Sequence, residues 1–375
     1  MTSSVRQIAV VEKRPIDKLT IKGFKSLQDV DLELGRLNVL IGPNGAGKSN
    51  LVSYFRMLIE MLGGRLQLWV AKRGGADRIL TFGFKQTPRL STQILYGDCE
   101  YECSLEHTND DRFVFSKERF SFDTGQISSR GQYHSAHRES SVSFRVTTYY
   151  SSGVPVVDHA ASLEKIRVYH FHDTSSSAPV KLTSQVHDNR YLRQDAGNLA
   201  AYLYMLRQAH EDIYDEIVKT VRLAIPFLDN FVLEREALNT NSIMLKWSHK
   251  DFDYEFLPSQ LSDGSLRFIC LVTALLQPDS PSTIIIDEPE LGLHPYAIHL
   301  LGALLRSASR RMQVIVATQS PQLLDEFSVD DLIVVELENG VSVFKRLKES
   351  QFSYWLEDYS VGELWDKNVL GGGVP

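Results

Sequence analysis

The sequence predicts an α/β fold in which a mixed sheet carries a phosphate-binding loop. The apolar run 37–41 precedes a glycine-rich turn that matches G-x-x-x-x-G-K-[ST] over 42–49, and apolar residues at helical spacing then continue to Met61. A second apolar run, rich in isoleucine, ends in adjacent carboxylates at 287–288, which is typical of a buried parallel strand. Alternating apolar and polar residues between these runs indicate an inserted, strand-rich segment.

Composition sets the broad class of the protein. The 375 residues allow two domains, or one large domain with an insertion, and 43% apolar with 23% charged residues is ordinary for a globular chain. A net charge of -7 argues against wholesale binding to nucleic acid, although a local basic face remains open. Three cysteines without a metal pattern favour a reducing compartment. We find no signal peptide and no apolar run near the ~20 residues that span a bilayer, so a cytoplasmic protein without a membrane partner is expected.

The turn at 42–50 has what a nucleoside triphosphate requires. Its glycines let several backbone N–H groups point at one anion, and the helix that follows adds a favourable dipole. Lys48 can reach the β- and γ-phosphates, and the Ser49 hydroxyl can ligate magnesium. The alternative is a glycine turn with a chance lysine, but the spacing and both flanks fit, so ATP with Mg²⁺ is expected. The residues expected to contact it are Asn44, Gly45, Ala46, Gly47, Lys48, Ser49 and Asn50.

Two half-buried strands, at 19–27 and 30–34, are expected to lead into this loop. Lys22, Phe24 and Lys25 lie where the nucleotide base could sit, and Phe24 could stack on it. The alternative is that Phe24 belongs to the core.

The middle of the chain is expected to be a compact β-rich insertion. Strands are predicted at 93–101 and 113–122, and the Ser-, Gly-, His- and Arg-rich stretch 124–152 indicates exposed hairpin connections. Strand-like alternation returns at 154–172.

Two histidines near the end of that alternation, His170 and His172, share one face. They could suggest a metal, but only Asp173 accompanies them, so a structural role is favoured.

Helices are predicted at 190–208 and 211–223, and Pro226 ends the second. Strands follow at 231–236 and 243–247. Basic side chains on the helical segment could line a groove for DNA, but a solvated helix face is favoured. They are Arg190, Arg193, Arg207, Lys219 and Arg222.

The second apolar run supplies two catalytic candidates. Asp287 can hold magnesium, and Glu288 can act as general base on the attacking water. A solvated turn is the alternative reading of two adjacent acids. Upstream, Ser262 is a natural N-cap for a helix at 266–276, and Gly264 allows a backbone to approach closely.

The order of these motifs carries a family resemblance. GPNGAGKS, LSDGS, IIIDEPELGLHP and VIVATQSP occur in a sequence that resembles the ABC-type ATPases of the RecF, OLD and SMC-like group. More closely, YHFHDTSSSAP, LSDGSLRF, DEPELGLHPYA and YSVGELWDKNVLGG resemble the bacterial predicted ATPase family within that group. The resemblance covers about 18–375.

The resemblance implies an ABC-type (RecF/SMC-like) ATPase head that forms a head-to-head homodimer around two ATP molecules. Ser262 and the Gly264 amide of one subunit would meet the γ-phosphate held by the other, and 291–295 would cross to the partner. Hydrolysis would remove that bridge and open the dimer.

Two departures from the family pattern affect these expectations. The signature reads LSDGS, so Asp263 places a negative charge near the γ-phosphate. Gln319 stands where many relatives have histidine; it can orient a water but cannot take a proton, so slow, switch-like hydrolysis is expected. Gln86 is a weak candidate for the Q-loop glutamine.

Three functions fit this ATPase. The favoured one is a molecular switch in DNA maintenance, DNA repair or anti-phage defence that controls a partner effector, a nuclease or toxin encoded nearby. DNA as a partner is left open. No OLD-type nuclease domain is expected, because 334–338 reads more simply as the last strand of the ATPase sheet. The alternatives are the nucleotide-binding subunit of a membrane transporter and a scaffold that binds ATP without hydrolysing it.

The predicted organisation has five parts. They are a flexible leader at 1–14, a first ATPase lobe at 15–90, an inserted β-rich and helical segment at 91–240, a second ATPase lobe at 241–350, and a helical tail at 351–375 that packs on the core.

Overall fold

The computed structural model describes residues 14–123, 128–133, 137–140, 150–151, 154–155 and 161–372. The predicted leader, apart from Arg14, and most of the predicted hairpin connections at 124–152 lie outside the described residues.

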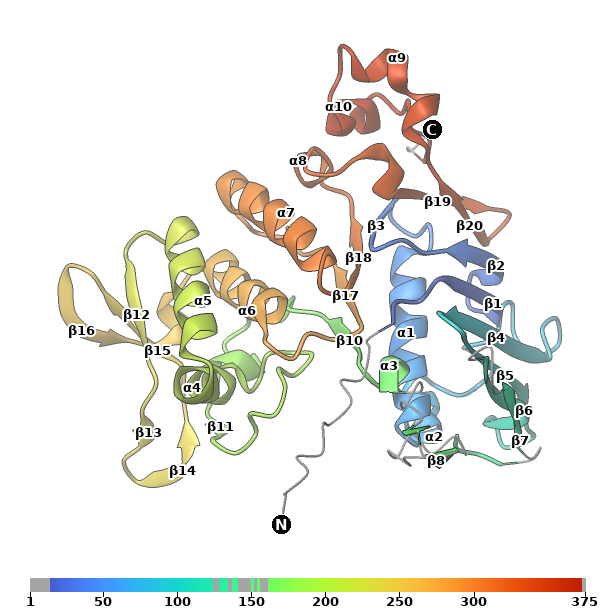
Figure 1. Ribbon diagram of the computed structural model, residues 1–375, viewed down its shortest axis with the longest axis horizontal. Helices are drawn as coiled ribbons and strands as arrows, with labels where there is room; N and C mark the ends of the chain where they lie inside the picture. Colours follow the sequence, from blue (N-terminus) through green and yellow to red (C-terminus); the bar gives the residue numbers. More distant parts are fainter. Residues whose placement is uncertain are drawn as a thin grey trace.

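A six-stranded sheet forms the centre of the molecule (Figure 1). Its neighbouring strands are parallel except for the last pair, β19 and β20, so the sheet is mixed, as predicted. All residues of β17 are buried, because Ile284 and Ile286 face one hydrophobic core and Ile285 faces another. In spatial order the strands are β10 (Ile166–Tyr169), β17 (Thr283–Asp287), β18 (Gln313–Thr318), β3 (Leu37–Ile41), β19 (Leu332–Glu338) and β20 (Val341–Arg346).

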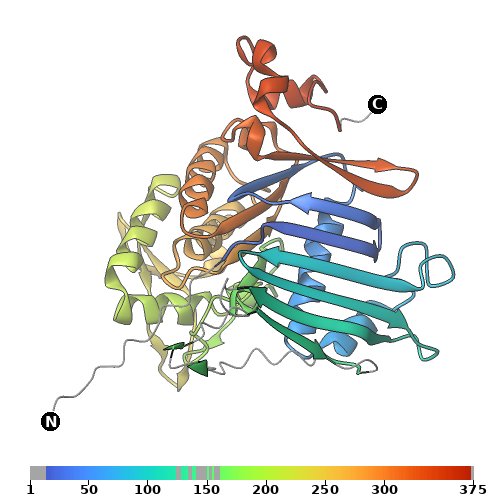
Figure 2. The same cartoon turned by 45° about the vertical axis from the view of Figure 1, so that its right-hand side comes forward.

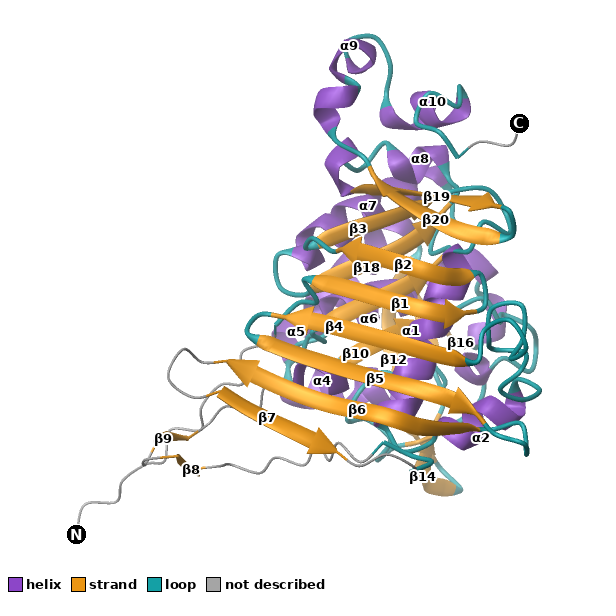
Figure 3. Cartoon of the chain, turned by 90° about the vertical axis from the view of Figure 1, so that its right-hand side faces the viewer, coloured by secondary structure: helices purple, strands orange, loops and turns teal. Residues whose placement is uncertain are grey.

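A second six-stranded sheet is antiparallel and stands out in Figure 3 as a broad layer. The predicted strand at 93–101 is wrong as one piece, because a turn at Gly97, with φ of 57°, folds it into a hairpin. In spatial order the strands are β2 (Leu27–Glu33), β1 (Lys18–Phe24), β4 (Arg89–Tyr96), β5 (Cys99–His107), β6 (Phe113–Asp123) and β7 (Ser128–Tyr133).

The segment predicted as an insertion, 91–240, contributes to both sheets. Strand β4 pairs with β1, so the antiparallel sheet continues from the first ATPase lobe without a break. Strand β10 pairs with β17 in the central sheet. This segment is therefore not one separate block, since its hydrogen bonds complete the ATPase core.

Helix α1 (Lys48–Leu62) lies between the two sheets (Figure 2). Its apolar face and the inner faces of both sheets form one hydrophobic core, while the other face of the central sheet packs against a second group of helices. The phosphate loop therefore leads directly into a helix that is packed between the two sheets.

A helical lobe covers the other side of the central sheet. The predicted helix at 190–208 begins only at Leu199, because Asn198 holds the preceding loop by accepting from the Arg193 amide and donating to the carbonyls of Asp188 and Tyr191. The longer helices here are α4 (Leu199–Ala209), α5 (Glu211–Ala224), α6 (Asp263–Leu276) and α7 (Pro295–Ser309). Small sheets at its edge comprise β11 (Ser184–Gln185), β12 (Leu228–Val232), β13 (Arg235–Glu236), β14 (Asn239–Ile243), β15 (Lys246–His249) and β16 (Phe252–Phe256).

The C-terminal helices pack next to the segment that follows β18. The Gly362 amide donates to Asp325 at 2.7 Å, which joins α10 (Val361–Asp366) to the end of α8 (Pro321–Leu324). Within the described part of the chain, no helix is both long and apolar enough to cross a membrane. The remaining short elements are α2 (Leu66–Lys72), α3 (Ala161–Glu164), α8 (Pro321–Leu324), α9 (Ser353–Leu356), α10 (Val361–Asp366), β8 (Tyr150–Ser151) and β9 (Val154–Pro155).

Candidate nucleotide-binding site

The topology of the central sheet brings three motifs to the edge where its parallel strands end. The phosphate loop follows β3, the carboxylate pair ends β17, and Gln319 follows β18, which lies between those two strands. The carboxyl ends of parallel strands meet at the same edge, where ligands of α/β proteins bind. Gln319 is therefore placed between the loop and the carboxylates by strand order alone.

The phosphate loop is folded tightly around Lys48. Gly45 and Gly47 take left-handed backbone angles of φ 82° and 118°, which favour glycine. Lys48 is only 5% exposed, and its Nζ donates to the carbonyls of Gly42 and Pro43. Burial lowers the pKa of Lys48, while the nearby carboxylate of Glu288 opposes this shift.

Asp287 and Ser49 fit a magnesium site. The Asp287 Oδ1 atom is buried and has no hydrogen-bond partner among the described residues, and the Ser49 hydroxyl lies beside the same carboxyl group. Burial raises the pKa of Asp287, and the adjacent Glu288 raises it further. A hydroxyl and a carboxylate are the oxygen ligands that Mg²⁺ prefers, and a cation here would relieve the buried negative charge.

A chain of side chains links the phosphate loop to the candidate base. Gln319 Nε2 donates to Asn44 Oδ1 at 2.7 Å and to Glu288 Oε1 at 3.1 Å. Glu288 has a left-handed backbone with φ of 45°. Its backbone N–H donates a hydrogen bond to the Ala317 carbonyl at 2.7 Å, which holds this conformation. These groups surround a cavity of about 140 Å³, lined by Pro43, Asn44, Gly45, Gly47, Lys48, Ser49, Asn50, Glu288 and Gln319.

Glu290 holds the backbone next to Gln319, a role that the sequence patterns did not indicate. Its Oε1 accepts from the Thr318 hydroxyl at 2.6 Å and from the Gln319 amide at 3.4 Å, which fixes the backbone that carries Gln319. Burial raises the pKa of Glu290, and its Oε2 atom is buried without a partner in the described chain. An acidic residue two positions past the carboxylate pair was the only available signal.

The signature turn lies outside this cavity. Ser262 caps α6, as predicted, by accepting from the Ser265 amide at 3.1 Å. Asp263 is 61% exposed at its side chain, and Lys181 lies 3.4 Å from it. A Cβ atom at Gly264 would overlap the carbonyl of Gly292, so a backbone does approach closely there, within the same chain.

Arg267 ties the signature helix to the other motifs, and it too was missed. The side chain is buried, and its guanidinium donates to the Phe171 carbonyl at 2.9 Å, to that of His172 at 3.4 Å, and to that of Leu291. His172 in turn donates from Nε2 to the Asp287 carbonyl at 2.9 Å. The start of α6 is therefore bonded to the two loops that follow β10 and β17.

The stacking role suggested for Phe24 is wrong. Its ring is fully buried and packs edge-on against Tyr54, with centroids 5.7 Å apart. Alternation alone would place Phe24 on the outer face with Thr20 and Lys22, but Gly23, with a left-handed φ of 86°, interrupts the alternation of β1. Lys22 is exposed and pairs with Asp29 at 3.3 Å, and Lys25 donates to the Ser53 hydroxyl at 2.9 Å. Neither lysine lines the cavity, so their contact with a base stays a prediction.

The remaining candidate residues lie outside the nucleotide-binding cavity. His170 and His172 lie 3.9 Å apart between ring centroids, and no group of three or more potential ligands in the described residues could hold a metal there. Gln86 is exposed in a turn before β4 and does not line the cavity. Of the basic residues on the helical segment, three bond within the chain: Arg193 to Asp188, Arg207 to Leu233 and Arg222 to Asp229.

Comparison with known proteins decides the family. Residues 37–325 match the family described as "AAA domain, putative AbiEii toxin, Type IV TA system". The chain belongs to this family. The AAA-domain chain is also 46% identical over 37 residues to an OLD nuclease of Thermus scotoductus, and 50% identical over 46 residues to the chromosome partition protein Smc of Desulfitobacterium hafniense. These matches cover 10% and 12% of the chain, but only 7% and 4% of the two relatives.

Solved structures confirm the fold of this AAA-domain protein. An Smc head bound to the C-terminal winged-helix domain of ScpA has a TM-score of 0.58 at 15% identity, covering 90% of this chain and 99% of the other. A Pyrococcus furiosus Smc head bound to the C-terminal domain of ScpA has a TM-score of 0.57 at 14% identity, covering 92% and 99%. The protein is a RecF/OLD/SMC-like ABC-type P-loop ATPase in family and fold.

Proposed function

We propose that this protein is a cytoplasmic ATPase that closes into a head-to-head homodimer around two ATP–Mg²⁺ and works as a slow switch. One observation carries the proposal. Gln319 bridges Asn44 of the phosphate loop and Glu288, which makes half of a nucleotide site within one chain. The signature turn at 262–264, with Ser262 and Asp263 exposed, does not line that half-site, so a second copy would supply it.

Each residue has a distinct role in this mechanism. Lys48 would exchange its loop carbonyls for the β- and γ-phosphates, and Ser49 with Asp287 would hold Mg²⁺. When bound, Mg²⁺ neutralises part of the charge on the triphosphate. Glu288 would take the proton of the attacking water, while Gln319 orients that water.

Slow hydrolysis follows from the same geometry. Gln319 is already bonded to Glu288, and an amide can orient a water but cannot accept a proton. We therefore expect low steady-state turnover and a long-lived closed dimer.

The cellular role is the broadest part of the proposal. The matched family description includes a toxin of toxin–antitoxin systems, and the short curated matches are an OLD nuclease and an Smc protein. These support a switch in DNA maintenance, DNA repair or anti-phage defence that controls an effector such as a nuclease or toxin. The Smc heads of similar fold carry a bound partner, ScpA, which favours partner docking over transport.

The decisive experiment traps the closed state. Glu288→Gln removes the proton acceptor but keeps the shape of the site, so ATP with Mg²⁺ should convert this variant from monomer to dimer in size-exclusion chromatography with light scattering. Glu288→Gln combined with Lys48→Ala is the matched control and should remain monomeric. A Glu288→Gln protein that binds ATP but stays monomeric at saturation would refute the dimer mechanism.

A further inference from the structure

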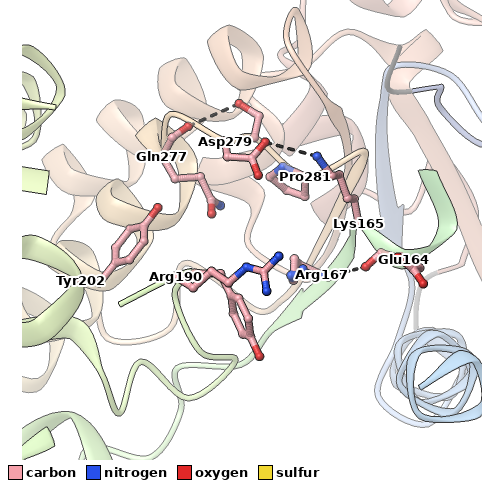
Figure 4. A pocket seen from close by; sticks show the side chains of 10 residues that line it. Glu164, Lys165, Arg167, Arg190, Tyr202, Gln277, Asp279 and Pro281 are labelled. Atoms are coloured by element: carbon pink, nitrogen blue, oxygen red, sulfur yellow. Dashed lines mark hydrogen bonds and ion pairs between the residues drawn. The ribbon is translucent and has the colours of Figure 1, made fainter. Parts of the chain in front are cut away.

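A second polar pocket lies at the opposite edge of the parallel sheet from the nucleotide site (Figure 4). It has a volume of about 200 Å³ and is formed where β10 and β17 begin, beside the loop before α4 and the connection from α6 to β17. The residues that line it include Lys165, Arg167, Arg190, Tyr202 and Asp279. None of the residues of the ATP mechanism reaches it.

Two arginines enter this pocket with unused hydrogen-bonding capacity. Arg190 makes no side-chain hydrogen bond or ion pair with any described residue, and Figure 4 shows it extended into the pocket. Arg167 donates through Nη1 to the carbonyls of Glu164 and Ile166, at 2.7 and 2.9 Å, which leaves its other donors available. Its guanidinium also lies 5.2 Å from the Tyr191 ring centroid, in a cation–π contact that favours this position of the side chain.

The charges of the pocket favour an anion. Lys165 is matched by Asp279, 3.5 Å away, so this pair adds little net charge. Glu164 also lines the pocket, so its three cationic side chains are opposed by two carboxylates and the lining keeps a net charge of +1. Arg167 and Arg190 face the same cavity, and an anion between them would be stabilised. Planar guanidinium groups bind phosphate oxygens in pairs, and the volume holds a phosphate group with a small sugar.

We propose that this pocket is a binding site for a phosphate monoester, held by Arg190 and Arg167. The site is separate from the ATP-binding site of the proposed dimer, because it shares no residue with the nucleotide cavity. The monoester could come from a free sugar phosphate or from the 5′ end of a nucleic acid, since both present the same group.

Binding is tested by calorimetric titration in the full chain carrying Lys48→Ala, which removes the phosphate loop as a competing site. Ribose 5-phosphate should bind in a saturable manner, and Arg190→Gln should weaken it at least about tenfold through loss of a charge-assisted bond. Arg310→Gln is the matched control, because Arg310 is also exposed, has no side-chain partner among the described residues, and lies outside the pocket. This control should bind as the parent does.

A 5′-phosphorylated DNA hexamer and its unphosphorylated form identify the source of the group. Tighter binding of the phosphorylated hexamer than of ribose 5-phosphate, lost in Arg190→Gln, supports a nucleic-acid end; the reverse order supports a free sugar phosphate. Arg167→Gln, checked for an unchanged unfolding temperature, should weaken whichever probe binds. Absence of saturable binding of either probe up to about 10 mM would overturn the proposal. Equal binding by the parent and Arg190→Gln would do so as well.

Discussion

Two helices of this chain begin in turns suited to a phosphate, and they begin in opposite ways. Helix α1 starts at Lys48 after a left-handed glycine without a side-chain cap, so its first N–H groups are left for an anion. Helix α6 starts from Ser262, whose hydroxyl already accepts from the Ser265 amide, and Asp263 adds a negative charge in the first turn. The first turn is a ligand site in itself, whereas in the second the Ser262 side chain already takes up the Ser265 amide.

The surroundings of the two turns differ in the same sense. The phosphate loop encloses a buried lysine and lines a cavity together with Glu288 and Gln319. The signature turn is exposed, but it is fastened from behind by Gly264 against Gly292 and by Arg267. A rigid, exposed turn with its own cap is suited to meet another molecular surface. Substitutions in the first turn should therefore affect nucleotide binding, and those in the second should affect association.

Lys48→Ala should give the largest effect. The phosphates would lose their main counter-charge in a buried loop, so the affinity for ATP–Mg²⁺ should fall at least about 100-fold. Calorimetric titration of the nucleotide measures this, and Lys219→Ala, an exposed lysine on α5, serves as the control. A loss of less than threefold would mean that the first turn is not the main phosphate site.

Gly264→Ala should separate association from binding. The new methyl group would meet the Gly292 carbonyl, which is backbone and cannot rotate away, so the turn would shift at a cost of about 1–3 kcal/mol. In a Glu288→Gln background we expect ATP-dependent dimerisation to be lost while monomer affinity for ATP stays within about twofold.

Gly35→Ala is the control for this change, because its added methyl group meets no atom closer than 3.7 Å. If Gly264→Ala weakens nucleotide binding as strongly as Lys48→Ala does, the two turns act as one site and the contrast between them fails.

Gln319→Ala should affect turnover alone. The change removes the link between Asn44 and Glu288, so we expect hydrolysis to fall about 10–100-fold with little change in ATP affinity. Phosphate release under saturating ATP measures it. Gln86→Ala is the control: it should hydrolyse ATP at the parental rate, and a matching loss would restore Gln86 as the Q-loop residue.

Residues close together in sequence were the ones that could be predicted. The phosphate loop, the Ser262 cap and the carboxylate pair each depend on neighbouring residues and a local strand or helix, and the structure has those strands and helices where the motifs require them. Strand order was not predictable in the same way. Nothing local to 313–319 indicates that β18 lies between β3 and β17, which is why the bond from Gln319 to Asn44 appears only in the fold.

Burial and long-range bonds explain the remaining misses. Phe24 could have faced a base or the core, and only the packing of β1 on α1 decides between them. Arg267 contacts carbonyls 24 and 96 residues away, so no sequence window contains its partners. The segment predicted as an insertion at 91–240 supplies strands to both large sheets, because strand pairing joins segments that are distant in sequence.

Glu290→Gln should give the smallest effect, on stability. Burial raises the pKa of Glu290, so the folded protein takes up a proton at a pH where the unfolded chain has lost it. The buried charge of Glu290 therefore lowers the free energy of unfolding above the folded-state pKa. This cost is lost as the pH falls through the folded-state pKa toward the unfolded value. Glutamine carries no charge, so the variant should match or exceed the parent in melting temperature by about 1–3 °C at neutral pH and lose this advantage in acid. Thermal unfolding of both proteins from neutral pH down to the ordinary range of a glutamate tests this. An advantage that grows on acidification would show that the Glu290 carboxylate stabilises the backbone of Gln319 as a charge, and the cavity beside the phosphate loop would then depend on Glu290 more than on burial.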